Sequence, residues 1–163
     1  MKAVTNATVL ILLAKIDRLD LLEIIKKIQT TPEIEKEVLE GKEISAEEKE
    51  RLENFFKKIA IKRSVASHHF DLGEGEKSAI SLCEQENILL FLSDDKKARK
   101  TASILGIGSL GTLGILLKNL QEKKITKKEA KEILTLLLHH SYYISTDLYA
   151  KVLELIEENF EKF

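Results

Sequence analysis

The sequence predicts one α/β domain, in which a short parallel sheet is covered by helices. Short apolar segments of strand length alternate with helical stretches of roughly 10–15 residues, the pattern of a parallel sheet flanked by helices. Ile88 to Leu92 is a continuous apolar run, as expected for a strand buried on both faces. The chain has 163 residues, of which 44% are hydrophobic, and no Pro-, Gly- or Ser-rich linker divides it. One core is therefore expected.

The first half of the chain contains signals for strands, helix starts and helix ends. Thr31 can cap a helix that begins at Pro32, because proline lacks only an N–H that the first turn leaves unpaired. Ser45 and Glu48 have the spacing of a capping box. The expected elements are a strand at 2–6, helices at 7–16, 19–28, 32–41 and 46–58, and a short strand at 59–61.

The second half alternates between strands and helices until about residue 121 and then becomes helical. Ala79, Ile80 and Cys83 repeat at helical spacing, and Thr126 with Glu129 forms a second capping box. The expected elements are helices at 75–86, 96–105, 113–121, 127–139 and 146–160, with strands at 88–92 and 107–110.

Composition excludes several classes of protein. Lysine and arginine total 26 against 27 aspartates and glutamates, so any nucleic-acid binding must come from a local basic patch. The single Cys83 cannot form an internal disulfide, and the apolar run of residues 7–14 is too short to span a bilayer. These features favour a cytoplasmic protein without membrane contact.

Three of the 27 carboxylates stand out by position. Asp94 directly follows the most hydrophobic predicted strand, and ligands of open parallel sheets bind beyond the carboxyl ends of strands. Glu37 and Glu76 fall on the apolar stripes of their helices, so we expect both to point inward. Two alternatives stay open. Asp94 can cap the next helix, and Glu76 can be a favourable charge in a first helical turn.

Carboxylates that converge repel one another unless a cation neutralises them, and oxygen ligands of this kind suit Mg²⁺ or Mn²⁺. The histidines are a weaker metal-site candidate, because the adjacent pairs His68–His69 and His139–His140 cannot each hold one ion with both rings. Cys83 is a weak nucleophile candidate, since burial in apolar surroundings raises the pKa of a thiol.

Five segments together resemble the ordered motifs of a PIN domain. They are Asn6 to Ile11 after the first strand, Pro32 to Val38, Gly75 to Ile80, Leu89 to Asp95, and Gly111 to Gly114. The resemblance covers about residues 1–120, and residues 144–155 are similar to the tail of one branch of the family. It implies a single PIN-like domain over 1–163, with a three-layer fold and a C-terminal helical extension over 121–163.

The resemblance also implies a function and a site. PIN domains are nucleases related to flap endonucleases, and many are toxins of toxin–antitoxin pairs that cut RNA with Mg²⁺ or Mn²⁺. Position by position, Glu37, Glu76 and Asp94 become the metal-binding acids, with Thr112 a polar residue beside them. Asn6 stands where most PIN domains place an aspartate, which removes one negative charge and puts activity in doubt. The implied partners are RNA and a small antitoxin protein.

A basic cluster follows Asp94 at once. Lys96, Lys97, Arg99 and Lys100 can bind substrate phosphate, or they can be the solvated face of a helix. The rival functional interpretation is a catalytically impaired PIN-like module that binds protein or RNA. Residues 136–138 and the apolar stripe of the last helix would then supply a partner surface, or a homodimer interface.

Overall fold

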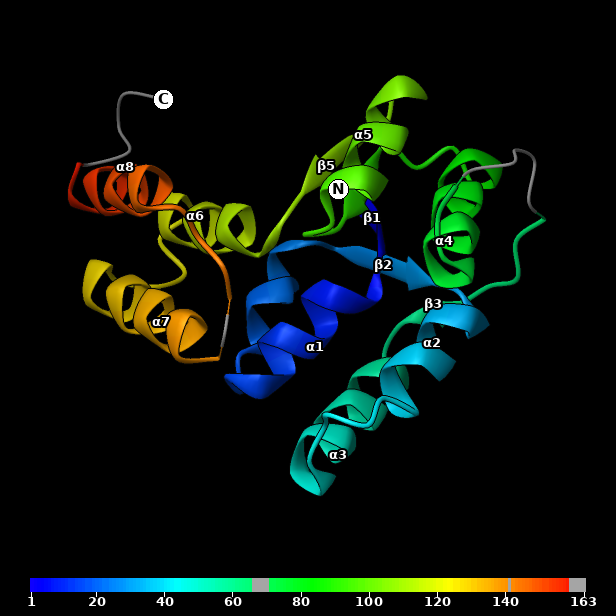
Figure 1. The fold of residues 1–163 in the computed structure, drawn as a ribbon, viewed down its shortest axis with the longest axis horizontal. Coiled ribbons are helices and arrows are strands. Elements are labelled where there is room, and N and C mark those ends of the chain that lie inside the picture. The colour runs from blue at the N-terminus through cyan, green and yellow to red at the C-terminus, as the bar shows by residue number, and fades with distance from the viewer. Residues whose placement is uncertain (66–70, 141, 159–163) are drawn as a thin grey trace.

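The computed structural model describes residues 1–65, 71–140 and 142–158. Its centre is a five-stranded, wholly parallel sheet in the order β3-β2-β1-β4-β5, with β1 at the middle (Figure 1). The strands are β1 (Lys2–Thr5), β2 (Lys27–Thr30), β3 (Ala60–Ile61), β4 (Leu90–Leu92) and β5 (Gly108–Leu110). The α/β class with a parallel sheet is thus confirmed.

Helices follow the strands and cover the sheet. They are α1 (Ala7–Lys15), α2 (Pro32–Leu39), α3 (Ala46–Phe56), α4 (Glu74–Gln85), α5 (Lys96–Ile104), α6 (Thr112–Gln121), α7 (Lys127–His139) and α8 (Thr146–Glu157), with a 3-10 helix η1 (Leu19–Ile24). The crossover helices link neighbouring strands, and α2 and α4 pack against each other. Helix α4 packs on β1 and β4, and α1 packs on α2 and α3.

One predicted element is wrong. Residues 19–28, expected as a helix, form η1 and then β2. Strand β2 pairs with β1 on one side and β3 on the other, and three of its four residues are buried. The strand reads Lys-Ile-Gln-Thr and has a single apolar residue, so it shows neither the apolar run of a fully buried strand nor the period of two of a half-buried one. The other elements lie within a few residues of their predicted bounds.

The polar residues of interest gather at one edge of the sheet. Because the strands are parallel, Thr5, Thr30, Leu92 and Leu110 all end at the same edge. The register pairs Thr5 of β1 with Leu92 of β4, and Leu92 with Leu110 of the edge strand β5. The residues that follow these strand ends are therefore brought together, although they are far apart in the sequence.

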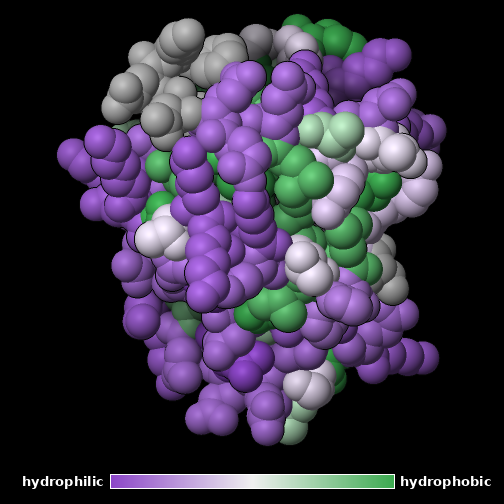
Figure 2. Space-filling model, turned by 90° about the vertical axis from the view of Figure 1, so that its left-hand side faces the viewer, coloured by the Kyte–Doolittle hydropathy of each residue, from purple (hydrophilic) through white to green (hydrophobic). Residues whose placement is uncertain are grey.

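Helices α6, α7 and α8 form a C-terminal layer beside the sheet (Figure 1). Figure 2 views this side of the molecule and shows a mostly hydrophilic surface crossed by a narrow apolar stripe. The exposed large apolar side chains of α7 and α8 are Leu136, Leu138 and Leu148, each about two-fifths exposed. Within the described ranges, no helix has the length and hydrophobicity needed to cross a bilayer.

Candidate functional site

Asp94 lies just beyond β4 and is held by residues from two other segments. The backbone N–H of Thr112 donates to Oδ1 at 2.8 Å, and the Thr112 hydroxyl donates to Oδ2 at 2.6 Å. The Tyr142 hydroxyl donates to Oδ1 at 3.3 Å. Thr112 is the first residue of α6, so its free N–H is available to a carboxylate. Three hydrogen bonds therefore fix the orientation of Asp94.

Gly111 makes room for two charged groups at this point. A Cβ on Gly111 would lie 2.7 Å from Oδ1 of Asp94 and 3.3 Å from Nη1 of Arg99. Both side chains thus lie over the bare backbone of residue 111. The absence of a side chain at Gly111 lets the carboxylate of Asp94 approach the backbone N–H of Thr112.

Asn6 is almost fully buried and both ends of its amide are in use. Its Oδ1 accepts the backbone N–H of Ala7 at 2.9 Å, which caps α1, and its Nδ2 donates to the Ser93 hydroxyl at 3.1 Å. Ser93 Oγ also accepts the backbone N–H of Asp95. Asn6 is therefore linked through Ser93 to the segment that carries Asp94.

Glu37 and Glu76 come from facing helices, α2 and α4, which pack together. A Cβ on Gly75 would collide with Oε2 of Glu37, so the carboxylate of Glu37 rests against the bare backbone at the start of α4. Burial of this carboxyl group and the neighbouring charge of Glu76 raise the pKa of Glu37 above its usual value. Among the described residues, Glu37 has no hydrogen-bond or ion-pair partner.

The structure corrects one expectation about these acids and settles two alternatives. Glu37 was expected to point inward, but α2 buries Ile34 and Val38, and Glu37 as a whole residue is exposed. Glu76 is half-buried, and its Oε2 accepts the backbone N–H of Gly73 at 3.1 Å, so it does serve the first turn of α4. Asp94 does not cap α5. Asp95 does, through the backbone N–H of Ala98 at 2.7 Å.

The predicted site residues form two groups at one edge of the sheet. The first is the Glu37–Glu76 pair, and the second is Asp94 with Thr112, linked to Asn6 through Ser93. No three acids, histidines or cysteines in the described part of the chain lie close enough together to hold a metal ion. The chemistry of the first group nevertheless fits a divalent cation, because an unpartnered carboxylate beside a second one is balanced best by positive charge.

The basic cluster lies on the outside of α5. Lys96, Lys97, Arg99 and Lys100 are all exposed, as the alternative of a solvated helix face also expected. Lys97 forms an ion pair with Asp71 at 2.7 Å. Arg99 is the member of the cluster that extends toward Asp94, as its place over Gly111 shows.

The weaker candidates from the sequence were Cys83 and the histidine pairs, and the structure adds a contact from Tyr142. Cys83 is 1% exposed, and burial raises the pKa of its thiol to about 12, so it cannot act as a thiolate near neutral pH. The His68–His69 pair lies outside the described residues. The sequence did not predict that Tyr142 contacts Asp94. Tyr142 lies 48 positions after Asp94, and no local pattern marks a contact of that range.

Comparison with protein families supports the α/β fold described above. A family model described as a PIN domain matches residues 2–158. The chain belongs to the PIN-domain family. No curated protein matches the chain. PIN domains belong to a superfamily of nucleases that act on nucleic acids and generally use divalent metals. The matched residues include α8.

Proposed function

We propose that this PIN domain is a divalent-metal-dependent endoribonuclease, with Glu37, Glu76 and Asp94 as its metal-binding acids. The observation that carries the proposal is Asp94. It stands at the carboxyl end of a central strand, is oriented by Thr112 and Tyr142, and shares its sheet edge with the Glu37–Glu76 pair. A carboxylate held by three donors is fixed in position before any ligand arrives.

Asp94 keeps the capacity to bind a cation while it is held in place. A carboxylate has about four lone-pair directions, and three are taken by the donors from Thr112 and Tyr142. The remaining direction belongs to Oδ2. Thr112 and Tyr142 are therefore positioning residues in this proposal, and Asp94 is the ligand.

A bound Mg²⁺ or Mn²⁺ would polarise a phosphate oxygen and lower the pKa of a coordinated water, the two contributions that phosphodiester hydrolysis requires. The protein's own share would be to bind divalent metal at the Glu37–Glu76 pair and at Asp94, and to keep Asn6 fixed between α1 and Ser93. No side-chain nucleophile is required, which agrees with the burial of Cys83.

Attraction of RNA to an acidic site requires nearby positive charge. The exposed residues of α5 provide it, and Arg99 over Gly111 is the cation best placed to contact a phosphate held near Asp94. The contacts are to the RNA backbone, so they raise affinity without selecting a sequence. Binding should accordingly weaken as salt concentration rises.

The test is metal-dependent cleavage of single-stranded RNA by wild type and two variants, each with a neighbour as control. Asp94→Asn is compared with Asp95→Asn, because asparagine also caps a helix and α5 should be preserved. Glu76→Gln is compared with Glu74→Gln, because glutamine at residue 76 can still accept the Gly73 N–H.

We expect wild type and both control variants to cut RNA with Mn²⁺ and to stop when EDTA is added. Asp94→Asn and Glu76→Gln should lose most of the activity while their thermal unfolding stays near wild type. If all five proteins cut equally, the activity is a contaminant. If wild type does not cut with Mn²⁺ but binds RNA or a protein in pull-down, the proposal fails in favour of a catalytically impaired binding module.

A toxin role in a toxin–antitoxin pair is a narrower form of the proposal and rests on the family alone. Expression of wild type in bacteria should then arrest growth, and Asp94→Asn should relieve the arrest. A gene for a small DNA-binding protein beside this one, whose co-expression restores growth, identifies the antitoxin. If expression of wild type does not affect growth, the toxin role is excluded. The proposal of RNA cleavage is then still decided by the cleavage assay above.

A further inference from the structure

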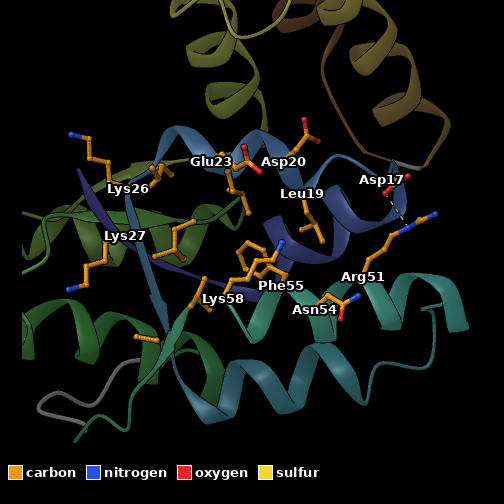
Figure 3. Close-up of a pocket in the computed structure, with 15 residues that line it drawn as sticks. Asp17, Leu19, Asp20, Glu23, Lys26, Lys27, Arg51, Asn54, Phe55 and Lys58 are labelled. Atoms are coloured by element: carbon orange, nitrogen blue, oxygen red, sulfur yellow. Dashed lines mark ion pairs between the residues drawn. The ribbon is translucent and has the colours of Figure 1, made fainter.

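A cavity of about 590 Å³ lies away from the candidate site, at the opposite edge of the sheet. Its lining comes from η1, from the first residues of β2 and β3, and from the C-terminal half of α3 (Figure 3). The first residues of parallel strands mark the edge opposite to the one where Asn6 and Asp94 lie. A ligand in this cavity would therefore not contact the residues proposed to bind the metal.

The inner wall of the cavity is apolar. Leu22, Ile25 and Ile28 are buried behind it, while Leu19 and Phe55 are half-buried and line it. The ring of Phe55 is held by an edge-to-face contact with Phe56, with centroids 6.1 Å apart. In Figure 3, Leu19 and Phe55 approach one another from the two sides of the cavity. A half-exposed, fixed ring is a surface on which a flat apolar group can pack.

Among the charged residues around the cavity that are not in ion pairs, cations outnumber anions. Arg51 is paired with Asp17 at 3.2 Å, and Asp20 is paired with Arg18 at 2.9 Å. Four charged residues of the lining have side chains with no ion-pair or hydrogen-bond partner in the described part of the chain, and these are Glu23, Lys26, Lys27 and Lys58. Three cations against one anion leave the rim with an excess of positive charge. The amino group of Lys58 points back over Phe55 in Figure 3.

The volume of the cavity limits the kind of ligand that it can hold. Sites for small organic molecules have volumes of about 300–1,000 Å³, and this cavity falls inside that range. It is far larger than a metal ion or a free phosphate requires, and it is too small to seat a folded partner. The apolar wall favours a ring system, and the excess of lysines favours a negative group attached to it.

We propose that this cavity is a binding site for a small organic anion with a flat apolar body. The body packs between Leu19 and Phe55, and the anionic group lies near Lys58. A nucleoside monophosphate and an aromatic carboxylate share this chemistry.

The test uses 8-anilino-1-naphthalenesulfonate, an aromatic sulfonate whose fluorescence rises on binding. It is titrated into the folded 163-residue chain in three forms, which are wild type, Lys58→Glu and Lys57→Glu. Lys57 is the matched control, since it is exposed, adjacent and outside the cavity lining. Adenosine monophosphate and salicylate are then added as competitors, in separate arms, to distinguish the two sources of the anion.

We expect saturable binding of one dye per chain, weakened about 2- to 30-fold by Lys58→Glu and unchanged by Lys57→Glu. Displacement by adenosine monophosphate indicates a nucleotide, and displacement by salicylate indicates an aromatic carboxylate. The proposal is overturned if binding does not saturate, if the two variants behave alike, or if neither competitor displaces the dye, which would mean an adventitious additive only. Dye bound to the apolar stripe of the C-terminal helices would give the second of these results.

Discussion

Gly75→Ala is the sharpest test of the Glu37–Glu76 pair, because it moves a carboxylate without removing it. The new Cβ would collide with Oε2 of Glu37 and lie 2.9 Å from Cδ1 of Ile34. Carbon and oxygen atoms in ordinary contact are roughly 3.5 Å apart, so the carboxylate must retreat by on the order of 1 Å. Metal sites need their ligands placed within about 0.5 Å.

The effect on stability should be small, because two contributions oppose one another. Alanine within a helix is favoured over glycine by about 1 kcal/mol. Crowding of the fully buried Ile34 opposes this by about 1–3 kcal/mol, which leaves a net loss of roughly 0–2 kcal/mol. For a chain of this size that is a lowering of Tm by about 0–8 °C.

The effect on metal binding should be much larger. We expect the Kd for Mn²⁺, measured by calorimetry, to rise about 10- to 100-fold, as it does when a group that supports a ligand is displaced. Gly73→Ala is the control, since a Cβ there would lie 3.6 Å from Oε2 of Glu76, an ordinary contact. A folded Gly75→Ala protein that binds Mn²⁺ as tightly as wild type would refute the role given to Glu37.

Three further predictions concern the same edge of the sheet. Thr112→Val removes the hydroxyl donor to Asp94 and should destabilise the protein by about 1.5 kcal/mol, the lower end for a charged hydrogen bond, whereas Thr112→Ser should be close to wild type in thermal unfolding. Glu37→Gln should raise Tm in EDTA at about pH 7 but not at about pH 4. The raised pKa of Glu37 means that the folded state loses stability as pH rises from the unfolded pKa through the folded one, and the loss persists above both. Asn6→Asp should lower stability by about 1–3 kcal/mol in EDTA, because it buries a charge, and should tighten Mn²⁺ binding in calorimetry.

Each of these predictions has an outcome that contradicts it. Equal Tm for the valine and serine variants of Thr112 would show that its hydroxyl does not hold Asp94. For Glu37→Gln, the rise in Tm could be the same at both pH values, or Glu35→Gln could raise Tm equally. Either result would show that helix propensity, and not the charge of Glu37, causes the rise. Weaker or unchanged Mn²⁺ binding by Asn6→Asp would exclude residue 6 from the metal site.

Most of the fold could be predicted because its signals are local. Capping boxes at Ser45 and Thr126 mark helix starts, and both are present in the structure. Strand β2 could not be recognised, since its four residues, Lys-Ile-Gln-Thr, include one apolar side chain and show neither an apolar run nor a period of two. Its identity depends on β1 and β3, which only the folded chain brings together.

The candidate site was predictable where a residue follows a strand and unpredictable where contacts join distant segments. Asp94 could be selected because it follows the apolar strand β4, but the adjacent Asp95 has the same local claim to cap α5, and geometry alone separates them. Glu37 fell on an apolar stripe by spacing, yet its long side chain carries the carboxylate outward to Gly75. Tyr142 has no local signal at all.

The order of the strands has a consequence for the protein during its synthesis. Asn6 and Ser93 are 87 positions apart in the sequence, and Tyr142 lies 48 positions after Asp94. Translation releases the N-terminal segments first, when β1 has no β4 to pair with and Asp94 has no Thr112. A nascent chain therefore carries the acids without their arrangement. For a protein proposed to cut RNA, this timing would protect the messenger that encodes it, because the cutting site is assembled only after nearly all of the chain has been made.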